Sequence, residues 1–212
     1  MTHLRTSMVD QLVWYGIRDA RVLDTMRAIP RHEFVPEAIR PEAYMDRPLP
    51  IGLEQTISQP FIVAHMTELA EPQPGDKVLD VGTGSGYQAA VLSTLVDRVY
   101  SIEILCPLAD QARARLERLG HSNVEVRCGD GYAGWPEQAP FELIIVAAAA
   151  PEIPGCLVEQ LAAGGRLVIP VGPDGEVQQL VVLEKGGDGT VTRRSVGSVR
   201  FVPMTGEAQR SR

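Results

Sequence analysis

The stretch that decides the fold is KVLDVGTGSG, residues 77–86. Its first half, Lys77–Val81, is a short apolar run typical of a buried strand. Three glycines follow at alternate positions, Gly82, Gly84 and Gly86, and they predict a tight turn that opens a helix. Because such a turn lets the backbone approach a ligand and directs helix N–H groups at it, we expect a nucleotide or nucleoside cofactor here.

The glycine spacing differs from that of dehydrogenases. A dinucleotide fingerprint of the form G-x-G-x-x-G requires glycine at position 87, where Tyr87 stands, and the third glycine comes one residue early. A nicotinamide-dependent dehydrogenase is therefore disfavoured. Asp80 precedes the turn by two residues, and we expect its carboxylate to meet a cationic or hydrogen-bonding part of the ligand. Local hydrogen bonding within the turn is the alternative for Asp80.

Two further acidic residues follow predicted strands. Glu103 stands nineteen residues after Gly84, the separation at which a carboxylate can accept hydrogen bonds from both ribose hydroxyls. A carboxylate in this role repels a 2′-phosphate, so NADP is disfavoured. Asp130, within Gly129-Asp130-Gly131, could accept a hydrogen bond from an adenine amino group, although a plain surface turn would also explain this tripeptide.

The pattern of apolar residues around these motifs predicts an α/β fold. From residue 75 short apolar runs alternate with helical stretches, which is typical of a doubly wound, mostly parallel sheet. The last two predicted strands flank Gly186-Gly187-Asp188-Gly189 and predict an antiparallel C-terminal hairpin. The predicted strands are 77–81, 98–103, 124–128, 141–148, 166–171, 178–184 and 190–199, with a short helix near 156–161.

The first 74 residues have a different, helical and irregular pattern. Val22, Leu23, Met26 and Ile29 have the spacing of a helix that Pro30 interrupts. An ordered loop over 51–60 is expected to lead into a helix that starts at Pro60. We therefore divide the chain into two regions that form one integrated unit. Residues 1–74 are a helical N-terminal cap that carries the segment Thr56-Ile57-Ser58, and residues 75–212 are a cofactor-binding α/β region with a C-terminal hairpin and a substrate-side tail.

Composition excludes several classes of protein. With 212 residues, 44% hydrophobic and 22% charged, the chain is expected to fold as one domain with an appendage rather than to be disordered. Its 27 acidic and 20 basic residues give a net charge of −7, which disfavours nucleic acid and anionic membranes as partners. No apolar run is long enough for a membrane helix and residues 1–10 lack a signal-peptide core, so we expect a soluble cytoplasmic protein.

The three cysteines, Cys106, Cys128 and Cys156, are odd in number and far apart in sequence. This spacing predicts neither a disulfide framework nor a metal clip. We expect three buried thiols in a reducing compartment and no bound metal.

The glycine turn, Glu103 and Asp130 together resemble the cofactor site of class I S-adenosylmethionine-dependent methyltransferases. A narrower resemblance, from about Val22 to Thr205, is to the protein-L-isoaspartate O-methyltransferase family. It depends on segments outside the glycine turn: LPIG (49–52), QTISQP (55–60), GDGY (129–132), PEIP (151–154), residues 161–172 and FVP (201–203). The QTISQP segment is the specific part, because most methyltransferases lack it.

The resemblance implies roles for individual residues. Ser58 matches the serine that lies beside the methyl-transfer site and is treated as catalytic, and Thr205 matches a position near the methionine part of the cofactor. The implied cofactor is S-adenosyl-L-methionine, converted to S-adenosyl-L-homocysteine, with no metal. The implied cofactor contacts are Thr56, Ile57, Ser58, Asp80, Gly82, Thr83, Gly84, Ser85, Gly86, Glu103, Asp130, Gly131 and Thr205.

The resemblance also implies an activity, the methylation of isoaspartyl carboxylates in damaged proteins by a monomeric enzyme. The ester would favour succinimide formation and return toward normal aspartyl linkages. Because a carboxylate with a pKa near ~4 is already ionised at neutral pH, no strong base is required. Two alternatives stay open: an enzyme that methylates one dedicated peptide, and a non-catalytic nucleoside-binding module that would not need Ser58.

The chain departs from the family pattern at two places. Leu53-Glu54 replaces a small, usually glycine-containing pair, and Glu54 adds a negative charge near an anionic substrate. Ala147 stands where threonine or glycine is common, and it begins the run AAAA (147–150) after the fourth strand. This run lacks the aspartate of metal-dependent catechol-type enzymes and the Asn/Asp-Pro-Pro-aromatic signature of amino-methylating enzymes, which favours carboxyl methylation.

Overall fold

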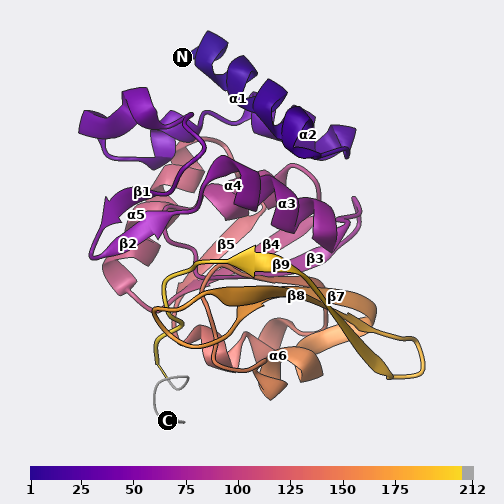
Figure 1. Cartoon of the computed structure of the whole chain (residues 1–212). Helices are drawn as coiled ribbons and strands as arrows, with labels where there is room; N and C mark the ends of the chain where they lie inside the picture. Colours follow the sequence, from indigo (N-terminus) through magenta and orange to yellow (C-terminus); the bar gives the residue numbers. More distant parts are fainter. Residues whose placement is uncertain (207–212) are drawn as a thin grey trace.

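The structure is a computed structural model of the chain, and it describes residues 1–206. Within these residues a seven-stranded sheet has the strand order β5-β4-β3-β6-β7-β8-β9 (Figure 1). The first five strands in this order are parallel, and β8 and β9 continue the sheet antiparallel. The strands are β3 (Lys77–Val81), β4 (Arg98–Glu103), β5 (Val124–Cys128), β6 (Phe141–Val146), β7 (Leu161–Val171), β8 (Gln178–Lys185) and β9 (Val191–Val199).

Both faces of the sheet are covered, which confirms the predicted doubly wound α/β fold. On one face lie α3, α4 and α5, with α1 and α2 packed outside α3 and α4 (Figure 1). The other face packs against α6 and the short 3-10 helix η3. The helices are α1 (Thr2–Tyr15), α2 (Ala20–Ala28), η1 (Arg31–Phe34), η2 (Glu37–Glu42), α3 (Pro60–Ala70), α4 (Tyr87–Ser93), α5 (Cys106–Arg118), η3 (Gly131–Ala133), η4 (Pro136–Gln138) and α6 (Gly155–Gln160).

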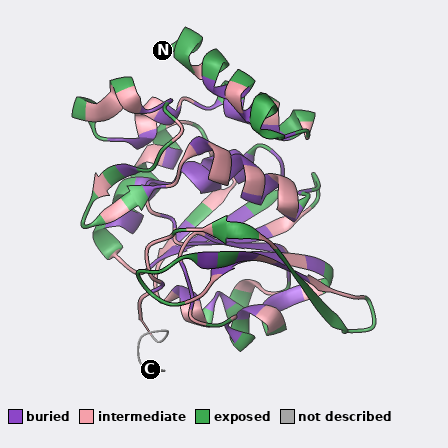
Figure 2. Cartoon of the chain, viewed as in Figure 1, coloured by how far each residue is buried: buried purple, intermediate pink, exposed green. Residues whose placement is uncertain are grey.

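The core follows from the side-chain alternation of the strands. Val78 packs into the cluster on the α3 and α4 side, and the next residue, Leu79, packs into the cluster on the α6 side. The first cluster continues from Met8 in α1 through the sheet to Leu180 in β8. Buried residues therefore run through the centre of the molecule, while the outer side of α1 is exposed (Figure 2). The N-terminal helices and the sheet share one hydrophobic core.

Two boundaries differ from the sequence prediction. Strand β7 begins at Leu161 rather than at residue 166, because Leu161 already pairs with Phe141 of β6 before the register shifts. The predicted loop over 51–60 contains a small antiparallel pair, β1 (Leu49–Gly52) and β2 (Gln55–Ile57), joined by Leu53 and Glu54. This pair forms a flap above the carboxyl edge of the sheet.

The prediction of three buried free thiols is wrong. Cys106, the first residue of α5, forms a disulfide with Cys128, the last residue of β5, and the free cysteine, Cys156, is exposed. The reason is topological: β4 and β5 are adjacent parallel strands in which Glu103 pairs with Cys128. The chain that leaves β4 therefore starts α5 beside the end of β5, and the two Cα atoms lie 5.0 Å apart.

Among residues 1–206, no helix has both the length and the apolar composition needed to cross a bilayer.

Candidate active site

The glycine turn connects β3 to α4 in the conformation that its sequence predicts. Gly82, Gly84 and Gly86 have φ angles of 92°, 51° and 86°, in the region that favours glycine. A Cβ at position 86 would lie 3.2 Å from the Leu116 side chain. The backbone N–H of Gly82 donates to the Ile102 carbonyl at 2.9 Å, so the turn is fastened to β4. Residues 82–86 thus form the fixed floor of a site at the carboxyl edge of the sheet.

Glu103 ends β4 beside this floor. Its Oε2 accepts a hydrogen bond from the Gly84 N–H at 2.8 Å, and its Oε1 accepts one from the Leu105 N–H at 3.0 Å. The side chain is buried, yet it lines a cavity of about 260 Å³. Each carboxylate oxygen has two lone pairs, so the orientation is fixed while acceptor capacity remains for hydroxyl groups in the cavity.

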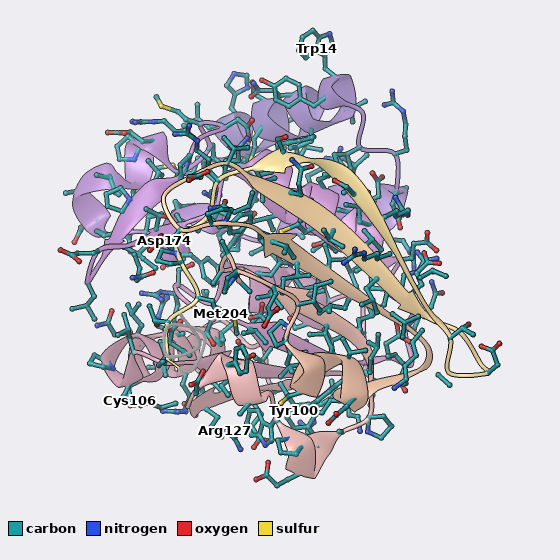
Figure 3. All side chains as sticks on the ribbon, turned by 60° about the horizontal axis from the view of Figure 1, so that its bottom comes forward. Trp14, Tyr100, Cys106, Arg127, Asp174 and Met204 are labelled. Carbon is teal, nitrogen blue, oxygen red and sulfur yellow. A yellow bond between two sulfur atoms is a disulfide. The ribbon has the colours of Figure 1, made fainter. Side chains whose placement is uncertain are left out.

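This cofactor cavity has walls from distant parts of the sequence. The β1–β2 turn supplies Leu53 and Glu54 on one side, and the C-terminal segment 202–205, which includes Met204 (Figure 3), supplies the other. Six of the predicted site residues line this cavity: Thr56, Gly82, Gly84, Glu103, Gly131 and Thr205. Ile102, Ile104 and Leu105 add apolar lining beside the acidic group. The structure therefore brings together predicted site residues that are up to 149 positions apart in the chain, from Thr56 to Thr205.

Other predicted residues lie beside or below the cofactor cavity. Ile57, Ser58, Thr83 and Ser85 line an adjoining cavity of about 40 Å³ that shares Gly82 and Gly84 with the first. Gly86 is the N-cap of α4 and lines none of these cavities. Asp130 caps η3 by accepting a hydrogen bond from the Tyr132 N–H at 2.9 Å, and it lies against Gly206.

Asp80 lies beneath the floor rather than in the cavity. It is completely buried; its Oδ2 accepts a hydrogen bond from the Ser101 hydroxyl at 2.7 Å, and its Oδ1 has no partner among the described residues. The Ser101 hydroxyl is also 2.6 Å from that of Thr83, in the glycine turn. Burial raises the pKa of Asp80 to about 7; the Ser101 hydrogen bond opposes this shift and the Glu103 charge adds to it. In this geometry Asp80 supports the turn through Ser101.

Ser58 lies in the short connection between β2 and α3. It lines a third cavity of about 260 Å³, together with Gln59, Arg200 and Phe201. Thr56 and Ala147 line this substrate-side cavity, the cofactor cavity and the small cavity between them. The three spaces therefore meet at Thr56 and Ala147, beside Ser58. A group transferred from one ligand to another would pass at this junction.

Sequence reasoning missed several lining residues. Met204 and Leu105 are apolar side chains without a motif of their own, although each follows a recognised residue within a few positions. Leu53 and Glu54 were noted only as departures, and the structure gives the reason why small residues are common there. Both have positive φ angles, 49° and 60°, in the two-residue connection of an antiparallel pair.

Comparison with known proteins decides the family. The model of the family described as protein-L-isoaspartate(D-aspartate) O-methyltransferase matches residues 3–209. The chain belongs to this family. The resemblance carried by QTISQP and the glycine turn is thereby confirmed.

Individual members of the protein-L-isoaspartate O-methyltransferase family are similar over nearly their whole length. A Polaromonas protein named protein-L-isoaspartate O-methyltransferase 2 is 60% identical over 189 residues, which cover 89% of this chain and 90% of that one. A Nitrosococcus oceani protein of the same name is 58% identical, covering 92% and 89%. A solved Plasmodium falciparum member, in complex with S-adenosyl-L-homocysteine, is 26% identical with a TM-score of 0.81, covering 95% and 98%.

Proposed function

We propose that this protein transfers the methyl group of S-adenosyl-L-methionine to the carboxylate of isoaspartyl residues in proteins, which starts their repair. The observation that carries the proposal is the junction at Thr56 and Ala147, where the cavity lined by Glu103 meets the cavity lined by Ser58. The names of the family and of its similar members, which specify isoaspartate as the substrate, support this assignment. So does the S-adenosyl-L-homocysteine bound by the Plasmodium member.

The residues of the cofactor cavity fit S-adenosyl-L-methionine. Glu103 offers acceptors for ribose hydroxyls, and Ile102, Leu105 and Met204 offer an apolar surface suited to a purine. A Cβ at Gly131 would clash with the Val81 side chain, so only glycine fits beside this surface. When bound, the cofactor supplies an electrophilic methyl group on a sulfonium sulfur. Within residues 1–206 no group of three or more His, Cys, Asp or Glu side chains is arranged to hold a metal.

The substrate side needs to orient a carboxylate and to exclude water rather than to supply a base. We propose that the Ser58 hydroxyl donates a hydrogen bond to one carboxylate oxygen, which leaves the other oxygen free to attack. Among the cavity residues, Arg200 supplies positive charge to an anionic substrate. Ile62 and Val202 give the same cavity an apolar part that helps to exclude water.

We further propose a division of labour along the chain. Residues 1–74 carry Thr56, Ile57 and Ser58 at the substrate side. Residues 75–212 bind the cofactor and add a substrate-side C-terminal segment, of which Arg200 and Phe201 line the cavity beside Ser58. The division is functional, since the two parts share one hydrophobic core. The predicted monomeric state and the direct cofactor contacts proposed for Asp80, Gly86 and Asp130 also stay proposals.

The deciding experiment compares two synthetic peptides that differ only in one isoaspartyl or aspartyl linkage. Incorporation of a radioactive methyl group from S-adenosyl-L-methionine is expected with the isoaspartyl peptide only. Equal labelling of both peptides, or none, would overturn the proposal. Binding of S-adenosyl-L-homocysteine by calorimetry without transfer to any peptide would instead support a nucleoside-binding module.

Ser58→Ala tests the proposed catalytic role. We expect kcat to fall by about tenfold or more while the dissociation constant for S-adenosyl-L-homocysteine changes less than about twofold. Ser122→Ala, which changes an exposed serine outside the three cavities, is the control. A large loss of cofactor affinity with kcat intact would contradict the role.

The alternative of a dedicated peptide substrate was suggested by Glu54. In the structure Glu54 lines the cofactor cavity and is not among the residues of the cavity beside Ser58. Its charge therefore lies on the cofactor side, which leaves general repair as the preferred proposal. Methylation of unrelated isoaspartyl peptides at comparable kcat/KM would support general repair.

We also propose a cytoplasmic location, in line with the bacterial relatives and the absence of a membrane-spanning helix in residues 1–206. The Cys106–Cys128 disulfide is the feature that counts against it, since reducing compartments open most disulfides. Cell fractionation combined with thiol alkylation before lysis tests both points. Recovery of the protein in the periplasm with Cys106 and Cys128 unalkylated would overturn the cytoplasmic assignment.

A further inference from the structure

The guanidinium group of Arg31 is a positively charged group that is buried in the interior of the protein. Its side chain is 0% exposed, and it lies in η1, between the N-terminal helices and the sheet. Burial lowers the pKa of Arg31 to about 10, so the guanidinium remains charged at neutral pH. An apolar side chain of similar length would avoid the unfavourable desolvation of a buried charge. The contacts of the guanidinium therefore need an explanation.

The hydrogen bonds of Arg31 are made to backbone carbonyl groups. Its Nε donates to the Ala43 carbonyl at 2.7 Å, and its Nη2 donates to the Ser58 carbonyl at 2.7 Å. Its Nη1 is buried without a partner among the described residues. One guanidinium thus joins the end of η2 to the connection that carries the proposed catalytic serine.

The same guanidinium contacts Tyr87, the residue that directly follows the cofactor floor. Its central carbon lies 4.8 Å from the centre of the Tyr87 ring, a cation–π contact. Tyr87 is the first residue of α4 and directly follows the glycine turn. Arg31 therefore bridges the Ser58 carbonyl and the first residue of α4.

The other end of the Ser58 connection is held independently. Asp46 Oδ1 accepts a hydrogen bond from the Phe61 N–H at 2.8 Å, and Asp46 Oδ2 accepts one from Gln59 Nε2 at 3.3 Å. These contacts fix the beginning of α3. Arg31 therefore holds the carbonyl of Ser58 itself, and Asp46 holds Gln59 and Phe61, which follow it.

We propose that Arg31 is a positioning residue for the methyl transfer, and that its buried guanidinium holds the Ser58 backbone at a fixed distance from the glycine turn. The kinetic part of this inference rests on the function proposed above. Ser58 reaches the junction from a two-residue connection with no regular structure, Ser58-Gln59, so loss of its carbonyl contact would let the hydroxyl move. A misplacement of about 1 Å can reduce a rate by about 100-fold.

The test compares Arg31→Met, Arg31→Lys and a control, Arg113→Met. Arg113 also donates two hydrogen bonds to a backbone carbonyl, that of Val126 at 2.9 and 3.3 Å, but it lies on α5 away from Ser58. All assays are made well below the lowest unfolding midpoint. Three quantities are measured: kcat with an isoaspartyl peptide, affinity for S-adenosyl-L-homocysteine, and amide hydrogen exchange of residues 55–62 relative to β3.

For Arg31→Met we expect kcat to fall at least about tenfold with cofactor affinity within about twofold, and exchange of residues 55–62 to accelerate selectively. Arg31→Lys, which keeps the charge and can donate to one of the two carbonyls, is expected to recover part of both effects. Arg113→Met is expected to lower the unfolding midpoint without either effect.

The inference is overturned if the Arg31 variants change kcat and the exchange of residues 55–62 no more than Arg113→Met does. If Arg31→Met does not fold, Arg31→Lys decides on the same criteria. If the unaltered enzyme methylates no isoaspartyl peptide, the proposed function fails, whereas the exchange measurement still decides whether Arg31 positions the Ser58 connection.

Discussion

The Glu103 carboxylate is joined to the Gly84 backbone N–H by a hydrogen bond of 2.8 Å. Its second oxygen accepts from the N–H of Leu105, the N-cap of α5, at 3.0 Å. One side chain therefore connects the glycine turn after β3 to the helix that follows β4. Any ligand that contacts Glu103 meets a group whose orientation is already fixed, which reduces the entropic cost of binding.

This relationship predicts the effect of Glu103→Gln. A glutamine amide has one oxygen, so its NH₂ group must face either Gly84 or Leu105, each of which already presents a donor. We expect affinity for S-adenosyl-L-homocysteine to fall by about 10- to 100-fold, the range for loss of a charged hydrogen bond. Calorimetry measures it, with the exposed Glu125→Gln as control. Unchanged affinity would mean that Glu103 serves the fold and not the ligand.

The Cys106–Cys128 disulfide predicts a dependence of stability on redox conditions. It links residues 22 positions apart. Closure of a loop of this length lowers the conformational entropy of the unfolded chain and so stabilises the folded protein by about 3 kcal/mol. The Cys106→Ser, Cys128→Ser double variant should lose a comparable free energy of unfolding, measured by urea titration without reductant. Cys156→Ser, at the exposed free thiol, should lose little. Identical unfolding midpoints for the double variant and the parent would show that the bond does not form in solution.

The connection between β1 and β2 predicts a stabilising substitution. Glu54 has a φ angle of 60°, in a conformation that costs a non-glycine residue about 1–2 kcal/mol. Glycine relieves this strain, but its greater conformational freedom in the unfolded chain lowers the free energy of unfolding by about 0.5–1 kcal/mol. Glu54→Gly should therefore raise the free energy of unfolding by about 0.5–1 kcal/mol. Glu54→Ala removes the charge and keeps the strain. If Glu54→Ala raises the free energy of unfolding as much as Glu54→Gly does, strain is not the cause.

Asp80 predicts a pH dependence that is opposite to that of most carboxylates. Its pKa rises from 3.8 to about 7 on burial, so the folded protein binds a proton that the unfolded chain releases between these values. Stability of the native chain should therefore fall as pH rises through this window, by up to about 4 kcal/mol. In Asp80→Asn the side chain at this position is uncharged at every pH, so this variant lacks the effect.

The measurement for Asp80 is urea unfolding of both proteins from pH 4 to pH 8. The stability of Asp80→Asn relative to the native chain should increase up to about pH 7 and then level off. A difference that is constant over the whole range would show that Asp80 titrates normally.

The parts of the fold that the sequence predicts are those with a local cause. The alternation of apolar runs and helices predicts the sheet, and three glycines at alternate positions predict the turn that the structure contains. Glu103 is predictable because the length of a strand-helix-strand unit fixes where the second strand ends. The same regularity places Gly131 and Gly82 at one edge of the sheet, in one cavity.

The unpredicted parts depend on contacts between distant segments. Nothing in the neighbourhood of Arg31 indicates that its charge is buried, since charged residues are usually exposed. The Cys106–Cys128 bond depends on the adjacency of β4 and β5, which the spacing of the cysteines does not reveal. The sequence predicts a loop in place of the β1–β2 pair, because Leu53-Glu54 lacks the glycine or asparagine that marks most two-residue turns.

The continuous core that joins α1 to the sheet has a consequence for enzyme engineering. Residues from Met8 to Leu180 pack in one cluster, so the segment that carries Ser58 is anchored by helices that precede it. Transplanting residues 55–60 onto another methyltransferase would leave behind the guanidinium and the carboxylate that hold them, Arg31 and Asp46. A recipient would need the whole region from α1 to α3, together with a sheet face shaped to receive it. We therefore expect that acceptor specificity can be transferred to another methyltransferase only with this whole folded layer, and not with the loop alone.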